Sequence, residues 1–182
     1  MKKIKGFTLI ELIVVIVILA VLASIAMPRF TSLQREARIA KLNAARGSVA
    51  TAAALTHATV LAKNGVGDTA ACPGGGGTAN NSNGATGTLC TEGGVVRMVN
   101  AYPDVTAIGT AGLLSAAGLS IAFNPTLAQL NADGYNYTAT AGATVATFQV
   151  QGATTPASCQ FTYTEAVANA APVISVLATS GC

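Results

Sequence analysis

Residues 1–27 read MKKIKGFTLIELIVVIVILAVLASIAM, and this stretch decides how the rest of the chain is interpreted. Between residues 7 and 27 only Thr8, Glu11 and Ser24 are polar. A helix of this length is about 31 Å long, which matches a bilayer core of about 30 Å. We therefore expect residues 7–27 to form a membrane-spanning helix.

The charges before this stretch give its orientation. Lys2, Lys3 and Lys5 precede the apolar residues, so the positive-inside rule places the N-terminus in the cytoplasm and the rest of the chain across the membrane. A cleaved signal peptide is the main alternative, because it also has a basic start and an apolar stretch. The small residues of LASIAMP, residues 22–28, would then allow cleavage after Ala26.

The glutamate inside the apolar stretch, Glu11, distinguishes these alternatives. Its neighbours, KGFTLIEL at residues 5–12, resemble the type IV pilin (prepilin) signature. In that family a peptidase cuts between a Gly and a Phe on the cytoplasmic side and methylates the new N-terminus, and the fifth residue after the cut is a Glu. The resemblance implies cleavage between Gly6 and Phe7, loss of a leader at 1–6, and methylation of Phe7.

A carboxylate deep in a bilayer costs about 2.5–3.5 kcal/mol even on lenient scales, so Glu11 should have a partner. Processing removes the lysines of the leader and creates a new α-amine on Phe7. We expect Glu11 to pair with this amine, in its own chain or in a neighbouring subunit, and so to set the axial register during assembly. The alternative is that Glu11 lies at the membrane surface and is solvated by lipid headgroups.

The residues beyond Pro28 are also typical of a helix. Proline in a helix interior removes a hydrogen bond and usually kinks the helix, and Asn64-Gly65 favours a left-handed helix end. We expect one helix over residues 7–63, bent near Pro28. Its second half, residues 28–63, is amphipathic, and the resemblance to pilins implies that this half packs under a globular head. Spacings of three and four predict one apolar stripe there: Phe30, Leu33, Ala37, Ala40 and Ala44.

The head is expected to span residues 64–182 and to begin with a Gly-rich loop. Residues 64–94 are dominated by Gly, Asn, Thr and Ala and show no apolar period, which indicates an exposed loop. The four consecutive glycines in it lack the Gly-Lys-Ser/Thr ending of a P-loop. Next we expect an apolar run at 95–99 and a short helix capped by Asp104.

A period of two after Asn131 predicts an antiparallel sheet over about residues 135–179. The expected fold class is α+β, and the resemblance to type IV pilins implies their fold, in which a long N-terminal helix packs against a C-terminal antiparallel sheet. The strands are expected near Tyr135–Thr140, Thr144–Gln151, Cys159–Glu165 and Pro172–Thr179.

All four cysteines follow the apolar stretch, and their wide spacing does not suit a metal site. Oxidised pairs in a periplasmic or extracellular domain fit better. Of the three possible pairings we favour Cys72–Cys90 and Cys159–Cys182, each of which stabilises the fold by about 3 kcal/mol in the loop-entropy model. Pilins typically have a disulfide near the C-terminus, and the C-terminal region also resembles that of mannose-sensitive haemagglutinin pilins.

The composition favours a structural protein over an enzyme or a nucleic-acid binder. The formal charge is +3, and without the three leader lysines the remainder is neutral, which argues against a basic nucleic-acid surface. One His and seven acidic residues form no catalytic pattern, so we expect no enzyme activity, no cofactor and no metal. His57 is expected to be a surface or head-contact residue.

The resemblance therefore implies the major structural subunit of a type IV pilus, a homo-oligomeric filament for adhesion, motility or aggregation. Its partners would be a prepilin peptidase/methyltransferase and the pilus assembly machinery. It would reside in the inner membrane as a single-pass protein before assembly and in the extracellular pilus afterwards. The alternatives are a pseudopilin of a type II secretion or DNA-uptake machine and, in a different class, a membrane-anchored periplasmic binding domain.

Overall fold

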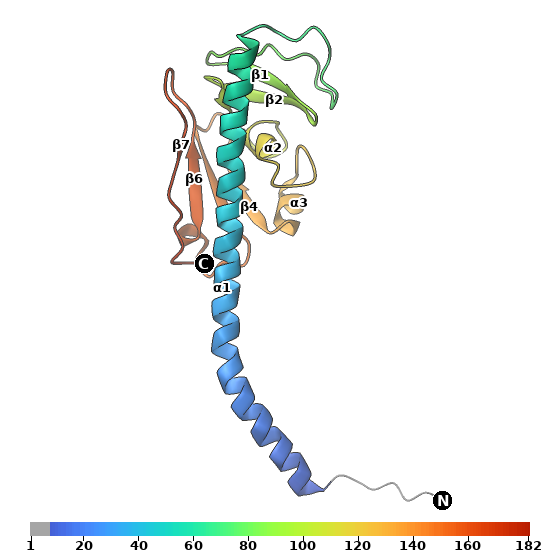
Figure 1. Cartoon of the computed structure of the whole chain (residues 1–182), viewed down its shortest axis with the longest axis vertical. Coiled ribbons are helices and arrows are strands. Elements are labelled where there is room, and N and C mark those ends of the chain that lie inside the picture. The colour runs from blue at the N-terminus through green and yellow to red at the C-terminus, as the bar shows by residue number, and fades with distance from the viewer. Residues whose placement is uncertain (1–7) are drawn as a thin grey trace, which may run out of the picture. The chain divides into compact units, whose positions relative to one another are not determined.

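The computed structural model of the chain describes residues 8–182, which begin with the long helix α1 (Leu9–Lys63). α1 has 55 residues and continues through Pro28, so the prediction of one long helix is confirmed for the described residues. The chain forms two compact units, Met1–Ala37 and Arg38–Cys182, and α1 contributes to both. Its course can be followed by colour in Figure 1.

In the second unit α1 packs against the head, and Leu42 is its first buried residue. The stripe predicted from residue spacing is not the buried face, because Phe30 and Leu33 are each 65% exposed and the alanines that follow are exposed too. Residue spacing alone did not identify the buried face, because small residues occur on both sides of this helix. The branched side chains of Leu42 and Val49 decide which side is buried. The buried residues of α1 are Leu42, Ala45, Val49, Ala52, Ala53, Thr56 and Val60.

Three basic residues of α1 bind the head through its backbone carbonyls. Arg38 Nη1 donates to the carbonyl oxygen of Cys182 at 2.8 Å, Lys41 Nζ to that of Asp133 at 2.5 Å, and Arg46 Nε to that of Ser175 at 2.9 Å. Hydrogen bonds from charged donors are stronger than those between neutral groups. These contacts therefore fix α1 against the C-terminal part of the head.

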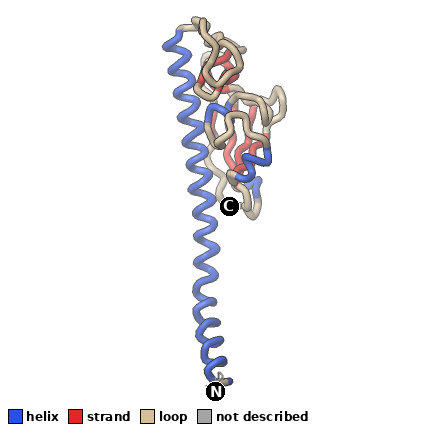
Figure 2. The backbone as a smooth tube through the Cα atoms, turned by 90° about the vertical axis from the view of Figure 1, so that its right-hand side faces the viewer, coloured by secondary structure: helices blue, strands red, loops and turns tan. Residues whose placement is uncertain are grey.

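The head contains two antiparallel sheets, which follow one another along α1 (Figure 2). The first has the order β1-β2-β3 and lies near the C-terminal end of α1 (Figure 1). The second has the order β4-β5-β6-β7, so every strand pairs with its neighbours in sequence. The first sheet consists of β1 (Gly87–Thr91), β2 (Gly94–Val99) and β3 (Tyr102–Pro103), and the second of β4 (Tyr135–Thr138), β5 (Val145–Val150), β6 (Gln160–Thr164) and β7 (Val173–Ile174).

The predicted C-terminal sheet is confirmed, and its alternation builds the core. In β5 and β6 every second side chain is buried, as expected for a sheet with one covered face. Phe148 lies directly opposite Phe161 in the register, and their rings stack at 4.8 Å. The ring of Tyr137 contacts Phe148 edge-on at 5.0 Å. These aromatic contacts occupy the centre of the core cluster that α1 covers.

Two predictions for the first half of the head are wrong. The region 64–94 is not loop throughout, because residues 87–91 form β1 and pair with β2. The short helix does not begin at Asp104: α2 (Leu113–Ala117) begins after Gly112, and a further short helix, α3 (Leu127–Ala132), is capped by Thr126. Asp104 instead binds Arg97 of β2, so its carboxylate is used between strands and not at a helix end.

Candidate functional site

The first turn of α1 gives Glu11 a partner within the chain. The Thr8 N–H and hydroxyl lie 3.4 and 3.5 Å from Glu11 Oε2, and the Glu11 N–H lies 3.4 Å from Thr8 Oγ1. The Thr8 carbonyl also accepts the Leu12 N–H. This is the reciprocal arrangement of a capping box, in which a carboxylate three residues into the helix satisfies free N–H groups at its positive end.

Sequence reasoning assigned Glu11 to the α-amine of Phe7 and did not identify this capping role. The Thr-x-x-Glu spacing of Thr8 and Glu11 was the available signal. Gly6 and Phe7, the predicted cleavage and methylation positions, lie outside the described residues. The pairing of Glu11 with the amine therefore stays a prediction.

The apolar half of α1 is exposed to solvent along its described length. All fourteen large apolar side chains between Leu9 and Met27 are 45–74% exposed. An 18-residue window of α1 has a mean hydropathy of 3.1, and the helix is long and apolar enough to cross a membrane. A helix that is apolar on all sides is stable only when something apolar surrounds it. This half of the helix therefore needs a bilayer or other helices around it.

Pro28 lies inside α1 and has no N–H for the carbonyl of the preceding turn. Hydroxyl groups near it bond backwards along the helix: Thr31 Oγ1 to the Pro28 carbonyl at 3.0 Å and Ser32 Oγ to the Arg29 carbonyl at 2.8 Å. Such back-bonding is common where helices bend. The predicted kink at Pro28 stays a prediction.

The prokaryotic N-terminal methylation motif family matches residues 1–27. This motif indicates a type IV pilin-like prepilin leader at the start of the chain. The motif match accounts for the three lysines, the apolar stretch and the embedded glutamate together, and it supports a type IV pilin-like or pseudopilin precursor. It also implies processing by a prepilin peptidase and insertion into a membrane.

The motif match covers residues 1–27 and does not extend over the head. Neither the curated proteins nor the solved structures include one that is detectably similar to this chain. The narrower resemblance to mannose-sensitive haemagglutinin pilins therefore stays a prediction. The α+β architecture of the described residues is the one expected for a type IV pilin.

The two disulfides cross-link the parts of the head that have little regular structure. Cys72 is bonded to Cys90, which joins the Gly-rich loop to β1, and Cys159 is bonded to Cys182, which joins the chain end to the start of β6. These are the pairs that the sequence analysis favours. Cys72, Cys159 and Cys182 are buried, so both bridges are covered by the fold.

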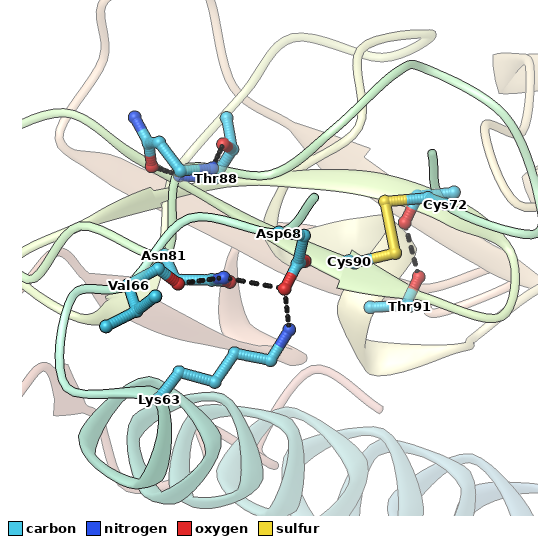
Figure 3. The surroundings of a disulfide bond; sticks show 10 residues. Lys63, Val66, Asp68, Cys72, Asn81, Thr88, Cys90 and Thr91 are labelled. Carbon is cyan, nitrogen blue, oxygen red and sulfur yellow. Dashed lines mark hydrogen bonds and ion pairs between the residues drawn. A yellow bond between two sulfur atoms is a disulfide. The ribbon is translucent and has the colours of Figure 1, made fainter. Parts of the chain in front are cut away.

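The Gly-rich loop is also anchored to the last residue of α1 (Figure 3). Lys63 Nζ lies 2.7 Å from Asp68 Oδ1, and Asn81 Nδ2 donates to the same oxygen at 2.9 Å. The hydrogen bonds from Lys63 and Asn81 lower the pKa of the Asp68 carboxyl. Asn81 also donates to the Val66 carbonyl and is fully buried with a positive φ of 51°. Asparagine tolerates the left-handed backbone region with positive φ. The position of Asn81 in an Asn-rich loop was therefore the only sequence signal for its role in anchoring the loop.

His57 is a head-contact residue, as expected. Its ring stacks on Tyr102 of β3 at 4.3 Å and an interplanar angle of 3°. The pair lines a cleft between α1 and the loops of the head, together with small residues and three asparagines, Asn83, Asn100 and Asn169. The residues lining this cleft include no carboxylate, cysteine or lysine.

Proposed function

We propose that the chain is the major structural subunit of a type IV pilus and that it polymerises through α1 into an extracellular filament. The observation that carries this proposal is the apolar half of α1, which follows a prepilin leader and is exposed on all sides. A bilayer can surround this half before assembly, and the same half of other subunits can surround it afterwards. One helix thus serves as membrane anchor and as filament core.

The head-covered part of α1 also leaves one face uncovered, and this face suits contact with another helix. Its residues recur at alternating spacings of four and three, which is the heptad spacing of coiled coils. They are exposed, and none is charged. We call them the outer seam: Ala40, Ala44, Gly47, Thr51, Ala54, Ala58 and Leu61.

Gly47 is the most informative member of the outer seam. Glycine in a helix interior is about 0.5–1 kcal/mol less favourable than alanine. A Cβ at this position would meet nothing within 4 Å inside the monomer, so packing within the chain does not require glycine. Small residues on a helix face allow another helix to approach closely. A neighbouring subunit against the outer seam would account for both the glycine and the missing charges.

The proposal includes the topology and the partners of the chain. We propose that the leader lies in the cytoplasm, that α1 spans the inner membrane once, and that the head is translocated and later displayed on the pilus. Disulfides persist in such an oxidising environment. The partners are a prepilin peptidase/methyltransferase, the assembly machinery and further copies of the same chain. We propose no catalytic role, no cofactor and no nucleic-acid ligand for the subunit.

Electron microscopy of sheared surface material tests the proposal. Long filaments whose only major component is this chain would support a major pilin. Absence of filaments at native expression, together with loss of secretion or DNA uptake on deletion, would contradict the proposal and favour a pseudopilin. A head that stays monomeric on the membrane with a bound ligand would favour the anchored binding domain instead.

A further inference from the structure

A short segment joins the two sheets of the head, and it does so through hydrogen bonds to the four-stranded sheet. We call residues 100–106, which include β3, the junction segment. Four hydrogen bonds between a side chain and a backbone group join it to the four-stranded sheet and to the loop after β6. They are Asn100 Nδ2 to the Ala166 carbonyl (2.7 Å), Tyr163 OH to the Pro103 carbonyl (3.0 Å), the Val105 N–H to Glu165 Oε1 (2.6 Å) and Tyr137 OH to the Thr106 carbonyl (2.9 Å).

Two carboxyl groups meet at the centre of this junction. Glu165 follows β6 directly and holds the Val105 N–H, while Asp104 is the residue before Val105. Because Glu165 Oε1 accepts the Val105 N–H, its carboxyl group lies beside that of Asp104, and the interaction between the two groups raises the pKa of Glu165. Arg97 Nε lies 3.2 Å from Asp104 Oδ2 and thus pairs with one carboxylate of the two.

The surroundings favour one shared proton at neutral pH. Burial, and then the hydrogen bond with Asp104, raise the pKa of Glu165 to about 7. The other titratable groups that face the pair are Arg97 and the tyrosines of β4 and β6, Tyr137 and Tyr163. Burial raises the pKa of Tyr137 and Tyr163, so both hydroxyls keep their protons and remain donors to the junction segment.

We propose that Asp104 and Glu165 hold one proton between them and that this proton locks the junction segment onto the four-stranded sheet. With the proton present, the pair is a hydrogen bond with a single negative charge, which Arg97 balances. Once the proton is lost, two carboxylates face each other across a partly buried contact, and Arg97 can neutralise only one of them. The lock therefore weakens in alkaline medium.

The direction of this pH dependence follows from the pKa of Glu165 in the closed and in the open state of the junction segment. In the open or unfolded state Glu165 titrates near its ordinary pKa of 4.5, whereas in the closed state its pKa is about 7. Between these values the closed state holds a proton that the open state has lost. Linkage to one proton changes the opening equilibrium by at most tenfold per pH unit, since one pKa unit is about 1.4 kcal/mol. The stabilisation is complete below about pH 4.5 and is lost as the pH rises through about 7.

Hydrogen exchange at the Val105 amide of the full-length chain in detergent micelles tests the lock directly. Protection factors, which are corrected for the intrinsic pH dependence of exchange, should fall about tenfold or more between pH 5.5 and 8.5. Glu165→Gln keeps an acceptor for Val105 and a donor for Asp104, so its protection should be high and change less than about twofold. Glu92→Gln is the matched control, because Glu92 is exposed in the β1–β2 turn and should leave the pH dependence as in the wild type.

Two results would overturn the lock: wild-type protection that is flat over this range, or a fall that persists in Glu165→Gln. If Glu165→Gln fails to fold, carboxyl ¹³C titration of the wild-type chain gives the answer. One carboxyl should titrate with a midpoint near pH 7, and titration of every carboxyl below about pH 5.5 would refute the proposal. This inference concerns the head alone and holds whether or not the chain forms a pilus.

Discussion

Replacing Gly47 separates the stability of the subunit from its ability to assemble. Alanine at this position in α1 adds a methyl group that meets nothing within 4 Å in the monomer, so only helix propensity changes. The expected gain is about 0.5–1 kcal/mol in the free energy of unfolding. For a chain of this size, such a gain raises the melting temperature by about 1–4 °C. Leucine is also a good helix former, and position 47 is exposed in the monomer.

The same changes should reduce assembly if a neighbouring helix contacts the outer seam. We expect Gly47→Ala to lower the pelleted filament fraction moderately and Gly47→Leu to lower it at least tenfold, while both melt at or above the wild-type temperature in detergent. Thr59→Leu is the matched control, because Thr59 is also exposed but lies about 100° around the helix from Ala58. Filament yields for Gly47→Leu equal to those for Thr59→Leu would refute the role of the outer seam.

Three further substitutions test other parts of the account. Glu11→Gln keeps the shape of the capping side chain but removes its charge, so filament yield should fall strongly, and normal yield would defeat the proposed pairing with the Phe7 amine. Phe161→Ala removes a fully buried ring and should cost about 3–5 kcal/mol in urea unfolding, whereas Ile121→Ala, at a fully exposed position, should cost less than about 0.5 kcal/mol. The double change of Cys159 and Cys182 to alanine should cost about 3 kcal/mol, and a cost below 1 kcal/mol would show that the C-terminus is held by its hydrogen bonds alone.

The sequence was most informative where one physical requirement dominates. A hydrophobic stretch of membrane length and the letters around Gly6 and Phe7 predicted the anchor and its processing, and the motif match agrees. The strict alternation of apolar and polar residues around Phe148 and Phe161 predicted the C-terminal sheet, because a sheet with one covered face buries every second side chain.

The sequence was least informative where small residues occur on both faces of an element, because the two faces then do not differ in hydrophobicity. Alanine occurs on both sides of α1, so the stripe through Ala37, Ala40 and Ala44 looked like a core face although it is exposed. β1 was missed because its residues, GTLCT at 87–91, lie among glycines and threonines, and pairing with β2 creates the strand. Tertiary context also decided the role of Asp104. Its carboxylate pairs with Arg97 in β2 and lies beside Glu165, which follows β6.

The mass and N-terminal sequence of the mature chain test the central claim most directly. We propose that the leader is removed on the cytoplasmic side and that the apolar helix is kept for the membrane and the filament. Chain purified from membranes or surface filaments should therefore begin at a methylated Phe7 and retain every residue to Cys182. An intact Met1, or a chain that begins at Met27 after cleavage behind Ala26, would contradict the account.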